Sequence, residues 1–260
     1  MVDLNGFKNY LNSTSLSDKT KETYVSSLEH YGNYFKEINT ENIQSYKKLC
    51  LQKYKPSTIN LRLHALQKYS EFKKTPVDIS YIKIQEPLFS ENVMSRHDYE
   101  KILNYLLNKK QYDWYVIFRL LGTTGLRIEE SKQVCVGDLK GCRKTILGKG
   151  TKTRVIWFPL GMRKEIMPLL KGKKDSDKIV CHDEGYIRKK LRDLQKQLKI
   201  KAKLSPHEFR RFYAREVYGK TKDVYLVKDL LGHSSVQTTM RYLRINISSI
   251  SRRMSKLVDW

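Results

Sequence analysis

Apolar residues recur at helical spacing in three segments of the first 90 residues. The first segment runs from Thr20 to Phe35, the second follows Thr40, and the third opens at Pro56. The apolar positions of the third segment are Ile59, Leu63, Leu66 and Tyr69. A repeat of three to four residues places such side chains on one face of an α-helix, where they can pack against neighbouring helices. The pattern predicts a small helical domain over residues 1–86.

The second half begins with the same periodicity and then changes. Helices are predicted over residues 95–107 and 115–121, and the second of them should stop at a turn formed by residues 122–125. Between residues 143 and 160, two short apolar runs flank a basic, glycine-rich tip, which is typical of a β-hairpin. Residues 186–199 return to helical spacing, with basic side chains between the apolar ones.

The expected fold class is therefore α+β, mainly helical with a small β-sheet. Residues 75–92 contain Pro76 and Pro87 and few apolar clusters, which favours a linker between two domains. The second domain should span residues 93–260. Its tail, residues 247–260, carries an apolar stripe of its own, which could pack within the same chain or against a second copy.

The charge of the chain adds a partner to this picture. The sequence holds 51 Lys and Arg against 27 Asp and Glu, a formal net charge of +24, and 38 of these basic and 18 of these acidic residues follow residue 90. Such a balance favours nucleic acid as the partner over a surface that is merely rich in lysine. There is no apolar run of about 18 residues and no signal-peptide pattern, so we expect a cytoplasmic, nucleoid-associated protein without membrane contact.

The stretch from Ser205 to Arg210 places two functional residue types on one helix face. Ser205 can cap a helix and Pro206 suits its first position, so His207 and Arg210 follow at i and i+3. The buried face of this helix is expected to hold Phe209, Phe212 and Val217. An arginine fork and an imidazole on one helix face suit a phosphate ligand.

A second histidine and a tyrosine follow downstream. An apolar helix is expected to end at Gly232, directly before His233. Its apolar stripe would be Leu226, Leu230 and Leu231. Ser234 or Ser235 can then cap a short helix with Val236, Met240 and Leu243 as apolar positions, and Tyr242 lies on it, nine residues after His233. A tyrosine hydroxyl can act as a nucleophile.

These motifs resemble those of the tyrosine recombinases, the integrase and Xer-type family. His-x-x-Arg, Leu-Gly-His and a tyrosine nine residues later resemble the family's C-terminal signature, with Phe209 standing where leucine is more common. Thr-Gly-Leu-Arg-x-x-Glu, ending at Glu130, resembles its first arginine motif, and Gly-Lys-Gly-x-Lys-x-Arg, ending at Arg154, resembles the turn of its catalytic hairpin. The Lys-Pro-Ser-Thr-Ile-Asn-Leu-Arg-Leu stretch that starts at Lys55 is similar to the third helix of the family's core-binding domain.

The resemblance implies a role for each matching residue. Arg127 and Arg210 would clamp the scissile phosphate, and Glu130 would orient Arg127. Tyr242 would attack the phosphorus and form a 3′-phosphotyrosyl link. The remaining catalytic roles would fall to His207 as base or proton relay, His233 as a hydrogen-bond donor to the phosphate, and Lys149, with Lys152 as the alternative, as the acid that protonates the leaving 5′-oxygen.

Double-stranded DNA is the implied partner, gripped by an N-terminal core-binding domain and a catalytic domain. The predicted DNA-binding residues are Lys55, Arg62, Lys152, Arg154, Arg188, Lys189, Arg192 and Arg211. Strand exchange would involve self-association on DNA, as a tetramer, with accessory proteins as further partners. No cofactor is implied, neither ATP nor a metal, because the phosphotyrosyl bond conserves the energy of the diester. The four cysteines form no C-x-x-C pair and should be reduced thiols.

Two other functions compete with site-specific recombination. A type IB topoisomerase uses similar tyrosine, arginine and histidine chemistry, but the small helical N-terminal domain and the Leu-Gly-His-Ser motif argue against it. A DNA-binding module that has lost catalysis is the second alternative, and the presence of every expected catalytic residue type argues against that. The DNA target, and the choice between integration, excision, inversion and dimer resolution, are left open by the sequence.

Overall fold

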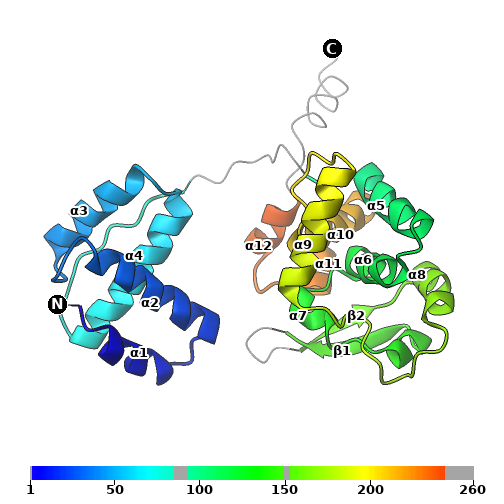
Figure 1. Ribbon diagram of the computed structural model, residues 1–260, viewed down its shortest axis with the longest axis horizontal. Helices are drawn as coiled ribbons and strands as arrows, with labels where there is room; N and C mark the ends of the chain where they lie inside the picture. The colour runs from blue at the N-terminus through cyan, green and yellow to red at the C-terminus, as the bar shows by residue number, and fades with distance from the viewer. Residues whose placement is uncertain (1, 85–92, 149–152, 244–260) are drawn as a thin grey trace, which may run out of the picture. The chain divides into compact units, whose positions relative to one another are not determined.

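The computed structural model describes residues 2–84, 93–148 and 153–243 (Figure 1). The chain divides into two compact units between residues 86 and 87. Both are mainly helical, and the one sheet among the described residues has two strands. This confirms the predicted α+β fold class. Lys149, Lys152 and the tail of residues 247–260, all named in the sequence predictions, lie outside the described residues.

The first unit is built from four helices: α1 (Leu4–Asn12), α2 (Asp18–Gly32), α3 (Thr40–Leu51) and α4 (Pro56–Lys73). Side chains at the starts of the first three cap their backbone N–H groups, and α4 begins instead with a proline, which needs no such partner. The core consists of Phe7, Leu11, Leu28, Tyr31, Ile43, Tyr46, Cys50, Ile59, Leu63, Leu66 and Tyr69. Helices α2, α3 and α4 confirm the three predicted helices, although α3 is capped by Asn39 and not by Thr40.

Helix α1 was not predicted. Its apolar side chains Phe7 and Leu11 are fully buried in the core of the first unit, where the helix packs on α2 and α4. A helix of nine residues is too short to be stable alone, so its formation depends on that packing.

The second unit is organised around α6 (Tyr112–Thr124), which has eight buried residues. It packs against α5 (Arg96–Asn108) and α10 (Pro206–Thr221). Aromatic rings fill these contacts, with the centroids of Phe118 and Phe209 5.2 Å apart and those of Tyr99 and Phe212 4.6 Å apart. The predicted turn at residues 122–125 was wrong in part, because α6 continues to Thr124 and only Gly125 is left-handed.

The two-stranded sheet confirms the predicted hairpin. Strand β1 (Arg143–Leu147) pairs antiparallel with β2 (Thr153–Trp157), so that Arg143 faces Trp157 and Leu147 faces Thr153. Ile146 and Ile156 are the buried residues of the two strands. The hairpin follows α7 (Ile128–Ser131) and the short 3₁₀ helix η1 (Val136–Lys140), and it leads into α8 (Leu160–Ile166) and η3 (Met167–Leu170).

The remaining helices carry the C-terminal motifs. They are α9 (Glu184–Gln197), α11 (Val224–Leu231) and α12 (Val236–Tyr242). In α11 the buried positions are Val227 and Leu231, whereas Leu226, expected to be buried, is 41% exposed. In α12 Met240 is likewise exposed, and Tyr242 takes its place in the interior. Both predictions were wrong for the same reason. The face of a short helix that is buried depends on the helices that it packs against, and the local apolar pattern does not determine it.

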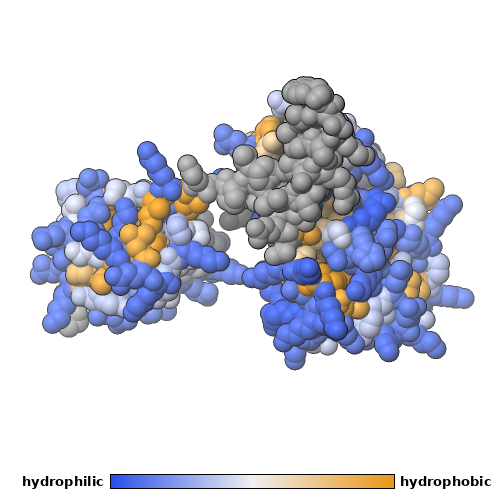
Figure 2. Space-filling model, turned by 90° about the horizontal axis from the view of Figure 1, so that it is seen from above, coloured by the Kyte–Doolittle hydropathy of each residue, from blue (hydrophilic) through white to orange (hydrophobic). Residues whose placement is uncertain are grey.

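The surface is chiefly polar. Figure 2 shows mostly hydrophilic residues on the visible face of each unit, with small apolar patches among them. Within the described residues, no helix has the length and apolar character that crossing a membrane requires. All four cysteines are free thiols.

Candidate active site

Arg210 forms the buried centre of the candidate site. It lies on the second turn of α10, a helix that starts with the Ser205 cap and Pro206 as its first residue. The residue is 1% exposed. Its guanidinium donates through Nη1 to the carbonyl of Gly125 (2.6 Å) and through Nη2 to the carbonyl of Leu231. Two turns that are far apart in sequence therefore hold this cation in place.

Both of those turns depend on a left-handed glycine. Gly125 ends α6 with φ +62°, and Gly232 ends α11 with φ +66°. A Cβ at Gly125 would lie 2.4 Å from Cδ1 of Tyr213, and one at Gly232 would lie 2.6 Å from Cδ of Arg154. Glycine is favoured at each position by conformation and by space.

One carboxylate, that of Glu130, serves three arginines. Its Oε1 accepts from Nη1 of Arg127 (2.7 Å), and its Oε2 accepts from the backbone N–H of Arg127 (2.8 Å) and from Nη2 of Arg154 (2.8 Å). Nη1 of Arg210 lies 3.7 Å from the same Oε2. The cluster thus holds three positive charges against one negative charge.

The carboxylate remains ionised at this position. Burial alone would raise the pKa of Glu130, but the hydrogen bond and charge of Arg154, together with the bonds from Arg127, lower it to about 2. Burial also acts on Arg210, and with the charges of Arg127 and Arg154 it lowers the pKa of this guanidinium to about 10. Arg210 is therefore still a cation at neutral pH.

His233 follows Gly232 and points into the same cluster. The residue is 6% exposed, and its Nδ1 lies 3.0 Å from the hydroxyl oxygen of Thr239. Desolvation, and then the charges of Arg210 and Arg127, lower the pKa of His233 to about 4. The imidazole is therefore neutral at pH 7. No sequence pattern indicated its partner Thr239.

Tyr242 lies with its ring between the two histidines. The ring centroids of His207 and His233 are 5.0 Å and 4.7 Å from that of Tyr242, and Cζ of Arg210 is 6.0 Å from it. Tyr242 is 8% exposed, at the end of α12. His207 is exposed on the first turn of α10, and desolvation on its protein-facing side, followed by the charges of Arg211 and Arg210, lowers its pKa to about 4.

The cluster contains polar atoms that lack partners. Among the described residues, five buried side-chain nitrogens have no hydrogen-bond partner, and four of them belong here: Nε of Arg154, Nε of Arg210, Nε of Arg211 and Nε2 of His233. Leaving a buried donor unpaired costs free energy, so such groups are rarely concentrated in one place without a ligand. Two of these residues, Arg154 and His233, line a cavity of about 390 Å³ together with Arg127 and others.

The structure therefore brings together six of the predicted site residues: Arg127, Glu130, His207, Arg210, His233 and Tyr242. It adds Arg154, whose side chain was predicted to bind DNA but is only 8% exposed. The flanks of the hairpin tip, Gly148 and Thr153, line the same cavity. The two candidate lysines between them lie outside the described residues.

The other predicted DNA contacts, except Arg211, lie apart from this cluster. Arg188, Lys189 and Arg192 are exposed on α9, where Arg188 pairs with Glu184. In the first unit Lys55 is exposed at the start of α4. Arg62 lies on the same helix and is half-buried, with its guanidinium 3.9 Å from the ring centroid of Tyr54 and Nη1 3.1 Å from the His30 ring nitrogens. Arg211 is half-exposed beside Tyr242.

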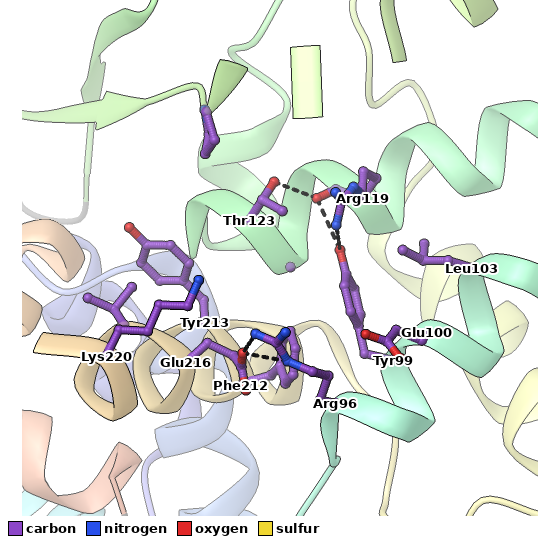
Figure 3. Close-up of a pocket in the computed structure, with 13 residues that line it drawn as sticks. Arg96, Tyr99, Glu100, Leu103, Arg119, Thr123, Phe212, Tyr213, Glu216 and Lys220 are labelled. Carbon is purple, nitrogen blue, oxygen red and sulfur yellow. Dashed lines mark hydrogen bonds and ion pairs between the residues drawn. The ribbon is translucent and has the colours of Figure 1, made fainter. Parts of the chain in front are cut away.

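A second cavity in this unit contains none of the predicted site residues. It measures about 430 Å³ and lies between α5, α6 and α10 (Figure 3). Its two arginines are already paired, since Arg96 binds Glu216 and Arg119 binds both oxygens of Glu165. This cavity lacks the unpartnered donors that mark the cluster around Arg210.

Comparison with known proteins gives matches over almost the whole chain. Residues 92–248 match the model of the phage integrase family, and residues 4–75 match the phage integrase N-terminal SAM-like domain. The tyrosine recombinase XerA of Thermococcus kodakarensis is 24% identical over 263 residues, which cover 96% of this chain and 93% of that protein.

Solved structures have the same fold. A lambda integrase (75–356) dimer bound to a COC′ core site matches with a TM-score of 0.74 and 16% identity, covering 92% of this chain and 93% of that one. A lambda integrase tetramer bound to a Holliday junction matches with a TM-score of 0.71 and 16% identity, covering 92% of this chain and 75% of that one.

Proposed function

This chain belongs to the phage integrase family of tyrosine recombinases, and on that premise we propose that it is a site-specific DNA recombinase. It would cleave and rejoin DNA through a 3′-phosphotyrosyl intermediate, for integration, excision or resolution. The observation that carries the proposal is the cluster around Arg210. Three arginines share one carboxylate, four buried donors there lack partners, and a tyrosine ring lies beside them.

The cluster suits a phosphodiester because it has an excess of positive charge, which the negative charge of the phosphate would balance. A scissile phosphate beside Tyr242 would accept hydrogen bonds from Arg127 and Arg210 on its non-bridging oxygens. These donors are fixed in advance by Glu130 and by the carbonyls of Gly125 and Leu231. Preorganised donors of this kind are often the largest single contribution to catalysis, because they need no rearrangement as charge develops.

His233 would be a further donor to that phosphate. When its Nδ1 accepts from the hydroxyl of Thr239, the proton of the neutral ring is on Nε2, the atom without a partner. We assign this tautomer because both ring nitrogens then have a hydrogen-bond partner when a phosphate is bound. A neutral donor here also avoids adding a fourth positive charge to the site.

Tyr242 would be the nucleophile. Its oxygen forms a bond to phosphorus as the bond from phosphorus to the 5′-oxygen breaks, which leaves a 3′-phosphotyrosyl link and a free 5′-hydroxyl. His207 would take the tyrosine proton. The arginines lower the pKa of His207, and a bound phosphate would offset their charge, so His207 should become a better base when DNA is bound.

The leaving 5′-oxygen needs a proton, and Lys149 is the proposed donor, with Lys152 as the alternative. Support comes from the hairpin, because the residues on both sides of its tip, Gly148 and Thr153, line the cavity that Arg127 and His233 share. The reverse reaction would use the same groups, with a 5′-hydroxyl attacking the phosphotyrosyl bond. The cycle then implies neither ATP nor a metal.

The proposed partner is double-stranded DNA, with self-association on it and a tetramer during strand exchange. A lambda integrase tetramer bound to a Holliday junction has the fold of this chain and supports that arrangement. The net charge of +24 agrees with a polyanionic partner. Residues 1–86 would act as the core-binding domain and residues 93–260 as the catalytic domain, in the cytoplasm where the DNA lies.

Covalent capture in the host would test this function. Cells expressing the protein are lysed under denaturing conditions, the protein is recovered, and the attached DNA is sequenced. We expect DNA from one or a few sites with the wild type and none with Tyr242→Phe, which keeps the ring and removes the nucleophile. Adducts at scattered sites, with relaxation of any plasmid, would favour a type IB topoisomerase. Recombination by Tyr242→Phe would overturn the assignment of the nucleophile.

A further inference from the structure

Arg154 has almost no free surface with which to contact DNA. It is the second residue of β2, and its side chain is 8% exposed. Nη2 donates to Oε2 of Glu130 at 2.8 Å, and Nη1 donates to the carbonyl of Leu230. Both ends of the guanidinium fork are therefore occupied by protein groups, and Nε, which has no partner, is itself buried.

The stem of the same side chain supports the turn before His233. A Cβ at Gly232 would meet Cδ of Arg154 at 2.6 Å, which shows how closely the arginine passes this left-handed residue. The side chain therefore extends from the hairpin past the end of α11 to the carboxylate on α7. It connects the strand that follows the hairpin tip, the acid that orients Arg127, and the turn that carries His233.

Arg154 also determines which cation Glu130 binds. Oε2 lies 2.8 Å from Nη2 of Arg154 and 3.7 Å from Nη1 of Arg210. Without Arg154, Oε2 would keep only the backbone N–H of Arg127, and the nearest cation to it would be Arg210. The buried carboxylate would then draw closer to Arg210, because a buried charge that loses a charged partner is costly. Arg210 would then be paired with Glu130 and less able to stabilise an incoming phosphate.

We propose that Arg154 is a positioning residue for DNA cleavage: it holds Glu130 away from Arg210 and fixes the turn before His233, and it does not contact DNA. The inference rests on the proposed function, because it assigns a role within that reaction. It replaces the expectation from sequence that Arg154 binds DNA directly.

The test compares binding with cleavage in the full-length protein. The probe is a duplex that carries the site recovered by covalent capture with the wild type, nicked so that the cleaved product accumulates. Arg154→Gln should cleave this duplex roughly tenfold to a hundredfold more slowly, by analogy with the loss seen when a partner that orients a metal ligand is removed. Its affinity should keep the wild-type dependence on salt concentration.

Salt dependence separates positioning from contact. Each phosphate contact contributes a slope of about 0.9 to the plot of log affinity against log salt. A slope reduced by about that amount in Arg154→Gln would overturn the inference and make Arg154 a DNA contact. Arg143→Gln is the matched control, an exposed arginine on the same hairpin, and should keep both the rate and the slope of the wild type.

A double variant tests the route through Glu130. Because Arg154 acts on this carboxylate, Glu130→Gln combined with Arg154→Gln should be about as slow as the slower single variant. Losses that multiply would mean that the two residues act independently and would overturn the inference. If Arg154→Gln does not fold, Arg154→Lys, which keeps the charge but can reach only one partner, is measured in the same way and should lose part of the rate.

Adduct formation by the wild type distinguishes a failure of this inference from a failure of the proposed function. A wild-type rate in Arg154→Gln, beside a wild type that forms adducts, would overturn this inference alone. A wild type that forms no adduct with any DNA would overturn the proposed function and this inference with it.

Discussion

At the scale of single residues, the decisive feature is the imbalance of charge around Glu130. One buried carboxylate faces Arg127, Arg154 and Arg210, and two neutral histidines complete the cluster. Burying charge is costly, and an excess of buried positive charge is costlier still. The cluster therefore lowers the free energy of unfolding, but it provides a site in which the hydrogen-bond donors for a phosphate are already in position.

The histidines should make the stability of the second unit depend on pH. The folded pKa of His233 is about 4, against an ordinary value of 6.5. As the pH falls from 6.5 to 4, the unfolded chain binds a proton that the folded chain does not, so the free energy of unfolding should decrease through this window. His207 acts in the same direction. Glu130, with its pKa lowered to about 2, adds a further loss below 4.5.

Urea unfolding at several pH values would measure this effect. The first unit contains no tryptophan, and Trp114 and Trp157 lie among the described residues of the second, so tryptophan fluorescence reports on the second unit. His233→Gln should flatten the decrease between pH 6.5 and 4, whereas His97→Gln, a change of an exposed residue on α5, should leave it as in the wild type. An unchanged slope in His233→Gln would contradict the assigned protonation state.

At the scale of elements, helix ends position the groups proposed to be catalytic. Helices α6 and α11 both stop at a left-handed glycine, and the residues that follow include Arg127 and His233. The same two turns present the carbonyls that bind Arg210. The rigid helices thus fix the positions of their C-terminal ends, and the residues that follow each end include a side chain of the proposed site.

Gly125→Ala should disturb the site through the backbone. A left-handed conformation costs a residue with a Cβ about 1–2 kcal/mol, and here the new atom would also lie 2.4 Å from Cδ1 of Tyr213. We expect a loss of at least that size in the free energy of unfolding of the second unit, measured by urea titration of tryptophan fluorescence, and slower cleavage.

Gly219→Ala is the matched control for that prediction. Gly219 lies within α10, and no atom is within 4 Å of a Cβ built on it. Alanine is the better helix former, so this variant should be as stable as the wild type or more stable by up to about 1 kcal/mol. If both variants lost stability equally, the special role of the turn at Gly125 would be refuted.

At the scale of the whole molecule, the chemistry is proposed for the second unit alone, whereas DNA binding is proposed for both units. Each unit has a hydrophobic core of its own. All six described residues that the proposal places in the catalytic machinery come from the second unit, whereas Lys55 and Arg62 come from the first. Losing the first unit should therefore weaken binding far more than it changes the chemical step.

A truncated protein of residues 93–260 would test this division. We expect it to fold, to bind its duplex more weakly than the full chain, and to form the phosphotyrosyl adduct at a rate close to that of the full chain once the DNA is saturating. Gel-shift titration and adduct formation on the nicked duplex give the two quantities. A folded fragment that forms no adduct at saturation would mean that the first unit supplies a group needed for chemistry.

Most of the elements, and the residue types of the site, could be predicted from the sequence by itself. Helical periodicity, capping residues and alternation are local properties, so α2 to α6, α9, α10 and the hairpin were recognisable from neighbours in the chain. The spacing of the histidine, arginine and tyrosine motifs likewise needs only short stretches of sequence. Helix α1 was missed because its stability comes from packing and not from its own nine residues.

Which of those residues contact one another depends on the tertiary structure. The bond from Arg154 to Leu230 joins positions 76 residues apart, and the bond from Arg210 to Gly125 joins positions 85 apart. No local pattern distinguishes a basic residue that binds DNA from one that is enclosed beside Glu130. Which cation a carboxylate binds, and which face of α11 or α12 is buried, depends on how the helices pack. The sequence therefore determined which groups are present, and packing determined which of them meet.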